Sequence, residues 1–295
     1  MSILYTKLTL SDIPAVRPFF DEINSRTCDF TVGGMFMWRD FYKMRFAVDD
    51  GTLFIKMTFP DGADYYAPPL SGSADKIKKG ILKLASDENG DLRFATVPEE
   101  FIPLFKDVLP HAAFFEQTEL SDYLYNADGL ISLKGRKFAA QRNLISNFKR
   151  SFPDFEFKDA AEVPTEELKA FLKNGYTADK NADEEERNEN REVLEVLDNL
   201  TIYGFSGCVL FGGGKIMGFS LGEKVGDTLF THIEKANREV HGAYQMIVNG
   251  FSSSFGAEAQ YINREEDMGD EGLRRAKLAY HPTKLLKKYI AEVHL

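Results

Sequence analysis

The order of expected helices and strands, which occurs twice along the chain, is the feature that most restricts its fold. An amphipathic helix beginning near Ser11 precedes three short strands. The first two of these strands flank Asp49-Asp50-Gly51, a typical hairpin turn. A helix over 74–84, a strand over 92–97 and a further short helix complete the first half.

The second half repeats this order. Three strands separated by glycine-containing turns precede a helix, a strand and a helix, over 202–211, 216–225, 228–234, 243–255, 259–262 and 271–280. A meander followed by helices can bury one face of a sheet beneath those helices. The sequence therefore predicts an α+β fold made of two such units.

The length of 295 residues also favours two domains, because single domains typically have ~100–200 residues. Hydrophobic residues make up 43% of the chain and include 25 phenylalanines, enough for two buried cores. We predict an N-terminal domain over 1–133, a basic bridging helix over 134–154 and a C-terminal domain over 155–295 that carries the functional site.

The balance of charge limits the partners. With 36 basic and 46 acidic residues the net charge is −10, which argues against DNA binding but leaves room for a local basic patch. No apolar run approaches the ~18 residues of a membrane span, and the N-terminus lacks the plan of a signal peptide. The two cysteines form no motif. We expect a cytoplasmic protein with no integral membrane segment.

A strongly polar segment begins where an apolar run stops at Ile262. Its side chains are Asn263, Arg264, Glu265, Glu266 and Asp267. Lys277 and Tyr280 follow on a helix face that they share with apolar neighbours. Ligand sites of α/β folds lie at the ends of strands, beside helix N-termini. We therefore expect functional groups here; the alternative is a salt-bridged loop before a surface helix.

A second candidate is the basic segment from Lys134 to Arg150. It contains six lysines and arginines and no acid, and its apolar spacing predicts a helix with one buried side. Arg136, Lys137 and Arg142 gather near the N-terminal half of that helix. Either the helix bridges the domains and pairs with acids elsewhere, or it contacts phosphate or another polyanion.

Three other motifs do not support a function. The pattern G-x-S-x-G around Ser220 lies inside an expected strand, whereas a nucleophile elbow needs a strand-to-helix turn. The glycines at 212–214 lack the rest of a Walker loop. The five histidines show no metal-ligand spacing, so no metal site is expected.

The meander and helix over 202–255 resemble the core of GNAT-type acyltransferases. In that family a loop before the helix binds the donor pyrophosphate through backbone amides and reads roughly [QR]-x-x-G-x-[GA]. Here the aligned stretch runs from Arg238 to Ala243. These two residues match the first and the last position of the pattern. His241 occupies a glycine place and hinders close backbone approach to phosphates, which argues against acetyl-CoA as the donor.

Further motifs point to one family. They are Tyr123-Leu-Tyr125, Gly135-Arg-Lys137, Arg142-Asn143, Glu234-Lys235, Asn263-Arg-Glu265, Gly272-Leu-Arg274 and Ala276-Lys277. With them the chain resembles the soluble DUF2156 relatives of the C-terminal domain of phosphatidylglycerol lysyltransferase. The resemblance implies two tandem GNAT-like domains, each a mixed, mostly antiparallel twisted sheet with flanking helices, related to Fem-type aminoacyltransferases. Those relatives move an aminoacyl group from aminoacyl-tRNA to a lipid hydroxyl or a peptide amine. This sequence lacks the membrane-spanning half of the lipid enzyme.

The leading hypothesis is therefore an acyltransferase, with aminoacyl-tRNA as co-substrate and a CoA thioester as the less favoured donor. Glu234 or Asp267 would bind the acceptor or act as general base, Lys277 and Arg264 would stabilise charge, and Tyr280 would donate a proton. The expected substrate-binding residues are Arg136, Lys137, Arg142, Asn143, Arg238, Asn263 and Glu265. The acceptor stays open between a small molecule, a peptide and a lipid headgroup. The alternatives are an acetyl-CoA-dependent N-acetyltransferase and a non-catalytic protein that binds tRNA or another ligand.

Overall fold

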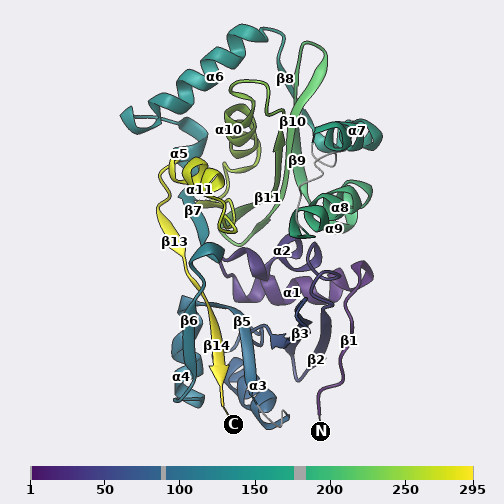
Figure 1. Cartoon of the computed structure of the whole chain (residues 1–295), viewed down its shortest axis with the longest axis vertical. Helices are drawn as coiled ribbons and strands as arrows, with labels where there is room; N and C mark the ends of the chain where they lie inside the picture. The colour runs from purple at the N-terminus through teal and green to yellow at the C-terminus, as the bar shows by residue number, and fades with distance from the viewer. Residues whose placement is uncertain (1, 88–90, 176–183, 295) are drawn as a thin grey trace. The chain divides into compact units, whose positions relative to one another are not determined.

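The computed structural model describes residues 2–87, 91–175 and 184–294 and divides into two compact units (Figure 1). The first unit consists of Met1–Asp122, Glu266–Asp270 and Leu285–Leu295, and the second of Tyr123–Glu265 and Glu271–Lys284. Two seven-stranded sheets, both flanked by helices, give the mixed α+β architecture that the sequence predicts. None of the helices in the described part of the chain is long and apolar enough to cross a membrane.

The first sheet is antiparallel except for one parallel pair, β4 with β5. Its strands, in spatial order, are β1 (Thr6–Lys7), β2 (Arg45–Asp49), β3 (Thr52–Thr58), β4 (Asp64–Tyr66), β5 (Leu92–Pro98), β14 (Lys288–Val293) and β6 (Ala113–Glu116). The hairpin β2–β3 forms as predicted. Asp50 and Gly51 at its tip both adopt positive φ, 47° and 67°, as a two-residue turn of this kind requires.

Helices flank this sheet, and α3 packs against β3 and α4. The α-helices are α1 (Ile13–Ile23), α2 (Val32–Phe36), α3 (Ala74–Asp87) and α4 (Ile102–Val108). The 3-10 turns are η1 (Leu10–Asp12), η2 (Cys28–Phe30), η3 (Glu99–Phe101) and η4 (Thr118–Leu120). The core beneath them is aromatic; Phe94, for example, packs edge-on against Phe105 at 4.8 Å between ring centroids.

The second sheet contains the predicted meander. Its strands, in spatial order, are β13 (Lys284–Leu286), β7 (Asp122–Asn126), β12 (Tyr261–Asn263), β11 (Thr228–Ala236), β10 (Lys215–Val225), β9 (Ser206–Gly212) and β8 (Glu156–Asp159). β12 pairs with β11 in parallel and with β7 antiparallel. Ser220 lies within β10 and is fully buried, so the G-x-S-x-G pattern forms no elbow.

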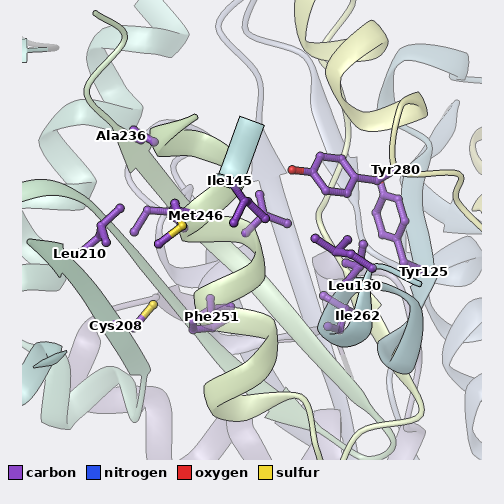
Figure 2. Close-up of a cluster of buried hydrophobic side chains, with 14 of the residues drawn as sticks. Tyr125, Leu130, Ile145, Cys208, Leu210, Ala236, Met246, Phe251, Ile262 and Tyr280 are labelled. Carbon is purple, nitrogen blue, oxygen red and sulfur yellow. The ribbon is translucent and has the colours of Figure 1, made fainter. Parts of the chain in front are cut away.

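The helices of the second unit include α10, which lies against β9, β10 and β11. They are α5 (Ala127–Ser132), α6 (Ala139–Ser151), α7 (Thr165–Gly175), α8 (Glu184–Asp198), α9 (Leu200–Tyr203), α10 (Ala243–Phe255) and α11 (Glu271–Leu278), with 3-10 turns η5 (Arg136–Phe138) and η6 (Ala160–Glu162). Figure 2 shows the buried side chains on this face, among them Met246 and Phe251 of α10 and Ile145 of α6. Gly222 permits the close contact, because a Cβ there would lie 3.1 Å from the ring of Phe251 and 1.9 Å from the carbonyl oxygen of Phe230.

The compact units do not follow the domain ranges predicted from the sequence. The helix expected to bridge the domains, α6, packs on α10 inside the second unit through Ile145 and Phe148. The C-terminal strand β14 belongs to the first sheet, where it completes the hydrogen bonding of both β5 and β6. The order of elements along the chain does not predict that β14 pairs with the first sheet, because this pairing joins segments that are far apart in sequence.

Candidate functional site

A gap in the second sheet positions the polar segment that follows β12. The parallel pairing of β11 and β12 covers only three residue pairs and ends at Phe230 and Asn263. β11 continues to Ala236, while the chain leaves the sheet after Asn263. Arg264 and Glu265 therefore lie beside the part of β11 that pairs with β10 but no longer with β12, where the sequence predicts functional groups.

Arg264 extends into this gap and pairs with Glu234 of β11. Its Nη2 lies 2.6 Å from Oε1 and its Nε 3.2 Å from Oε2, which makes the contact bidentate. The arginine is only 8% exposed. Burial alone would lower the pKa of the guanidinium, but the carboxylate of Glu234 outweighs it and the pKa is raised. The guanidinium of Arg264 is therefore charged at any physiological pH.

Two tyrosines enclose the guanidinium of Arg264. Its central carbon lies 4.9 Å from the ring centroid of Tyr280 and 5.8 Å from that of Tyr125, within the range of cation–π attraction. The Tyr125 hydroxyl donates to the carbonyl oxygen of Lys277 at 2.9 Å. Burial raises the pKa of the Tyr280 hydroxyl, which therefore stays protonated and able to donate.

Three polar atoms near this ion pair are buried and have no hydrogen-bond partner among the described residues: Arg264 Nη1, Tyr280 Oη and Ser220 Oγ. Ser220 lies directly opposite Glu234 in the pairing of β10 with β11. An unsatisfied buried polar group costs about 1–3 kcal/mol. A ligand that bonded to these atoms would recover that cost, so the arrangement favours binding at this place.

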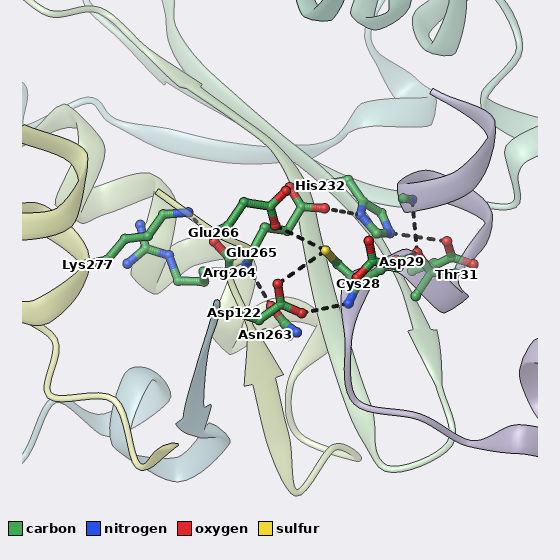
Figure 3. Close-up of polar contacts among 12 residues, drawn as sticks. Cys28, Asp29, Thr31, Asp122, His232, Asn263, Arg264, Glu265, Glu266 and Lys277 are labelled. Atoms are coloured by element: carbon green, nitrogen blue, oxygen red, sulfur yellow. Dashed lines mark hydrogen bonds and ion pairs between the residues drawn. The ribbon is translucent and has the colours of Figure 1, made fainter. Parts of the chain in front are cut away.

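The turn that carries Arg264 is held by its neighbours. The Glu265 backbone N–H donates to Asn263 Oδ1 at 2.6 Å, and Glu265 adopts a positive φ of 55°. Lys277, 6% exposed, donates from Nζ to the carbonyl oxygen of Arg264 at 2.5 Å (Figure 3). In this structure Lys277 and Asn263 thus position the arginine; the charge-stabilising role predicted for Lys277 stays a prediction.

His232 of β11 forms a second buried polar group that the sequence reading missed. Its Nδ1 lies 2.7 Å from Glu265 and its Nε2 3.1 Å from Glu223, and its ring stacks on those of Phe205 and Phe230. Figure 3 shows the contact with Glu265. Burial lowers the pKa of the imidazole, but the two carboxylates raise it further, to about 9. His232 is therefore a cation at neutral pH and cannot serve as a general base.

The charge on His232 predicts a dependence of stability on pH. Because the folded-state pKa of about 9 exceeds the ordinary value of 6.5, the stabilisation is complete below pH 6.5 and disappears as pH rises through 9. The loss should reach about 3 kcal/mol. Urea unfolding at several pH values should show the free energy of unfolding of the unaltered protein falling between pH 6.5 and 9. In His232→Gln the free energy of unfolding should depend less on pH over the same range. Equal slopes in both proteins would show that His232 does not carry the effect.

A pocket of about 540 Å³ lies beside the tyrosines. Tyr125 and Tyr280 line it together with Lys134, Lys137 and His281. His281 Nε2 lies 3.1 Å from the carbonyl oxygen of Lys137, which ties the basic segment to the end of α11. Its wall also includes Asp128 and the apolar Leu130, so two lysines outnumber one carboxylate there. The pocket can therefore hold an anionic group next to a planar one.

The other residues of the basic segment that were predicted to bind substrate do not line this pocket. Arg142 donates from Nη1 to the carbonyl oxygens of Leu133 at 2.5 Å and Gly135 at 2.7 Å, so it holds the loop before α6. Arg136 and Asn143 are exposed. Of the predicted cluster, Lys137 alone lines the pocket of about 540 Å³, and Lys134, which the prediction did not include, lines it as well.

The loop that resembles a pyrophosphate loop lies at the N-terminus of α10. Arg238, His241 and Gly242 line a smaller pocket of about 210 Å³ there. Gly242 has a φ of 88°, and a Cβ at this position would lie 2.4 Å from the carbonyl oxygen of Leu144. The close approach that Gly242 permits is thus made by α6 and not by a ligand.

Asp267 is the one predicted catalytic residue outside this group. It belongs to the first compact unit, and its Oδ1 accepts a hydrogen bond from the backbone of Gly269 at 2.9 Å. The second unit brings together Glu234, Arg264, Tyr280 and Lys277. A role for Asp267 as general base stays a prediction.

The structure thus places a helix-flanked mixed sheet in each unit, and in the second unit a polar cluster beside the point where the parallel pairing of β11 and β12 ends. The chain belongs to the phosphatidylglycerol lysyltransferase C-terminal family, whose model matches residues 20–292. This membership confirms the family that the motifs of the sequence indicated.

Two solved structures share the fold over nearly the whole chain. A conserved protein of unknown function from Bacteroides thetaiotaomicron is 32% identical, with 99% of each chain covered and a TM-score of 0.88. The C-terminal domain (DUF2156) of a protein described as a lysylphosphatidylglycerol synthetase from Agrobacterium fabrum is 13% identical, covers 96% of this chain and 91% of its own, and has a TM-score of 0.68. An uncharacterised protein of Mycoplasmoides gallisepticum is 21% identical over 59% of this chain, and the match spans only 56% of that relative's length.

Proposed function

We propose that the protein is an acyltransferase that moves an aminoacyl group from an aminoacyl-tRNA-type donor to an amine or hydroxyl acceptor. The observation that carries the proposal is the buried Arg264–Glu234 pair, which leaves Arg264 Nη1 and the Tyr280 hydroxyl unpartnered among the described residues. Membership of a family described by lysyl transfer supports an aminoacyl rather than an acetyl group.

The roles of the side chains follow from the chemistry of an ester. The attacking amine or hydroxyl adds to the ester carbonyl, and negative charge develops on the carbonyl oxygen. Arg264 Nη1 and the Tyr280 hydroxyl are donors that can bond to this oxygen, and preorganised donors of this kind are worth several kcal/mol. Glu234 would accept the proton of the attacking group as the new bond to the carbonyl carbon forms. The same proton would pass to the ribose oxygen as its bond to that carbon breaks, so that the donor leaves as a free ribose hydroxyl.

The donor's phosphates would bind at the pocket of about 540 Å³. Lys134 and Lys137 line it, and Tyr125 and Tyr280 connect it to the ion pair. An RNA end offers phosphates for the lysines and a base that can stack on an aromatic ring. The acceptor end of a tRNA is thus the partner that this chemistry fits. Transfer assays would identify the group that receives the aminoacyl group, whether on a small molecule, a peptide or a lipid headgroup.

Binding of charged tRNA tests the donor. We expect Lys134→Ala with Lys137→Ala to weaken binding of an aminoacyl-tRNA pool and to reduce the slope of log affinity against log salt by about 1 to 2. The matched control is Lys149→Ala with Arg150→Ala, which removes the same charge from the far end of α6. Binding should be measured by filter retention at several salt concentrations, and transfer by release of labelled amino acid.

The same experiment can contradict the proposal. If both double variants lose the same affinity, binding follows overall charge and not this pocket. Tight binding without any release of labelled amino acid, even with mixed amine and hydroxyl acceptors, would favour a non-catalytic tRNA-binding protein.

A second candidate is an acetyl-CoA-dependent N-acetyltransferase. The pocket of about 210 Å³ beside Arg238 favours it, because this is the place of the pyrophosphate loop in GNAT enzymes. The exposed His241 and the approach of α6 to Gly242 weigh against it. A thermal shift with CoA that disappears in Arg238→Ala would favour this candidate over the aminoacyl donor.

A further inference from the structure

The first unit contains a buried cluster that the proposed reaction does not use. Lys288, 1% exposed, places Nζ 2.7 Å from Asp122 Oδ1, 2.8 Å from Asp29 Oδ2 and 3.5 Å from Glu266 Oε2. The same nitrogen lies 3.3 Å from Cys28 Sγ. Figure 3 shows Cys28 beside the carboxylates of this cluster.

Cys28 is fixed in its position. Its backbone N–H donates to Asp122 Oδ2 at 2.7 Å, and its thiol lies 3.3 Å from Asp122 Oδ1 and 3.2 Å from Glu266 Oε2. Nitrogen and sulfur are thus at contact distance, with three carboxylates around them. A divalent cation would have to displace the ammonium of Lys288, which already pairs with those carboxylates; the amine and thiol are the reactive pair.

We propose that Cys28 and Lys288 form a reversible covalent cross-link when the protein is oxidised by a peroxide. In the first step peroxide oxidises the thiol to a sulfenic acid and releases water. In the second the Lys288 nitrogen attacks the sulfur, an N–S bond forms, the S–O bond breaks, and a second water leaves with one proton from nitrogen. The ammonium gives up one further proton, and the product is a sulfenamide.

The neighbouring groups suit this chemistry. Asp122 has a pKa of about 7, because burial raises it more than Lys288 lowers it. Burial lowers the pKa of Lys288, but Asp122 and Asp29 raise it further, so loss of a proton from the ammonium limits the second step. Burial also raises the pKa of the Cys28 thiol. Because the thiolate is the form that peroxide oxidises, this raised pKa slows the first step. The side chains of Asp29 and Glu266 are 20% and 18% exposed, so the cluster lies close to the surface of the unit, although Cys28 itself is only 4% exposed.

The cross-link would join distant parts of the chain within one unit. Cys28 lies in η2, and Lys288 begins β14, 260 residues later. A bond between them closes a loop of nearly the whole chain and ties the last strand of the first sheet to its N-terminal segment. Oxidation would thereby stabilise this unit against unfolding.

Mass spectrometry of the full chain tests the proposal. After peroxide treatment we expect a loss of about 2 Da relative to the reduced chain, or a gain of about 14 Da if a second peroxide leaves an oxygen between nitrogen and sulfur. Proteolysis should give one peptide pair linking Cys28 to Lys288, and dithiothreitol should separate it.

Variants identify the atoms involved. Cys28→Ser and Lys288→Arg should abolish the linked peptides, whereas Cys208→Ser, which alters the other cysteine, should leave their yield unchanged. If the unaltered chain shows only sulfinic or sulfonic Cys28, or an unmodified thiol after prolonged treatment, the proposal is wrong. Because that result comes from the unaltered chain, it does not depend on the folding of any variant.

Discussion

Replacing Arg264 by alanine is expected to lower the free energy of unfolding by about 3–5 kcal/mol. The change leaves the carboxylate of Glu234 without its partner and removes the planar group packed against Tyr125 and Tyr280. The Glu234 side chain is 17% exposed, so water can compensate part of the loss and the lower end of the range applies. Urea unfolding at pH 7 measures the change.

Two controls separate the ion pair from general effects of charge. Arg93→Ala removes an arginine whose contact with Glu292 is 3.6 Å long and well exposed, and should cost less than about 1 kcal/mol. Combining Arg264→Met with Glu234→Gln removes both charges and should cost less than the sum of the single changes. Additive costs would show that Arg264 and Glu234 act independently, which would contradict the proposed site.

Replacing Lys288 by methionine should have a comparable or larger effect, about 4–5 kcal/mol at pH 8. Three carboxylates lose their common cation, and the replaced side chain is only 1% exposed. The neighbouring Lys287, whose side chain is 42% exposed and pairs with Glu116 at 3.0 Å, is the matched control: Lys287→Met should cost less than about 1 kcal/mol.

The cost of Lys288→Met should also depend on pH. Asp122 has a folded-state pKa of about 7, above its ordinary value of 3.8. A carboxyl group with a raised pKa destabilises the fold at high pH, and this penalty fades as pH falls and the group is protonated. Without Lys288 the penalty is larger, so the difference from the unaltered protein should shrink between pH 8 and pH 5. A difference that is independent of pH would contradict this account of the cluster.

The order of helices and strands and part of the site can be predicted from the sequence, because both depend on local patterns. Hairpins, helix faces and the polar turn after Ile262 can be recognised within about 20 residues of sequence. Local patterns single out Arg264, and the family motif singles out Glu234 beside Asp267, but neither shows that Arg264 and Glu234 form a pair. Which acid Arg264 meets depends on where the pairing of β11 with β12 ends.

What the sequence did not predict depends on pairings across long distances. His232 contacts Glu223 because a bulge at Leu221 and Gly222 shifts the register of β10 on β11, and no periodicity of the sequence encodes that shift. Lys288 meets Cys28 only because β14 returns to the first sheet. Order along the chain alone predicts that the segment after 285 belongs to the second domain, so the sequence does not reveal this contact.

The position of β14 between β5 and β6 has a consequence for the order in which the protein can assemble during synthesis. All strands of the second sheet from β7 to β12 leave the ribosome before β14 does. Until then β5 and β6 have open edges toward each other, because the strand that joins them does not yet exist. The half of the protein that is made first is therefore finished last, and a chain that stops before Lys288 exposes two unpaired strand edges to other chains.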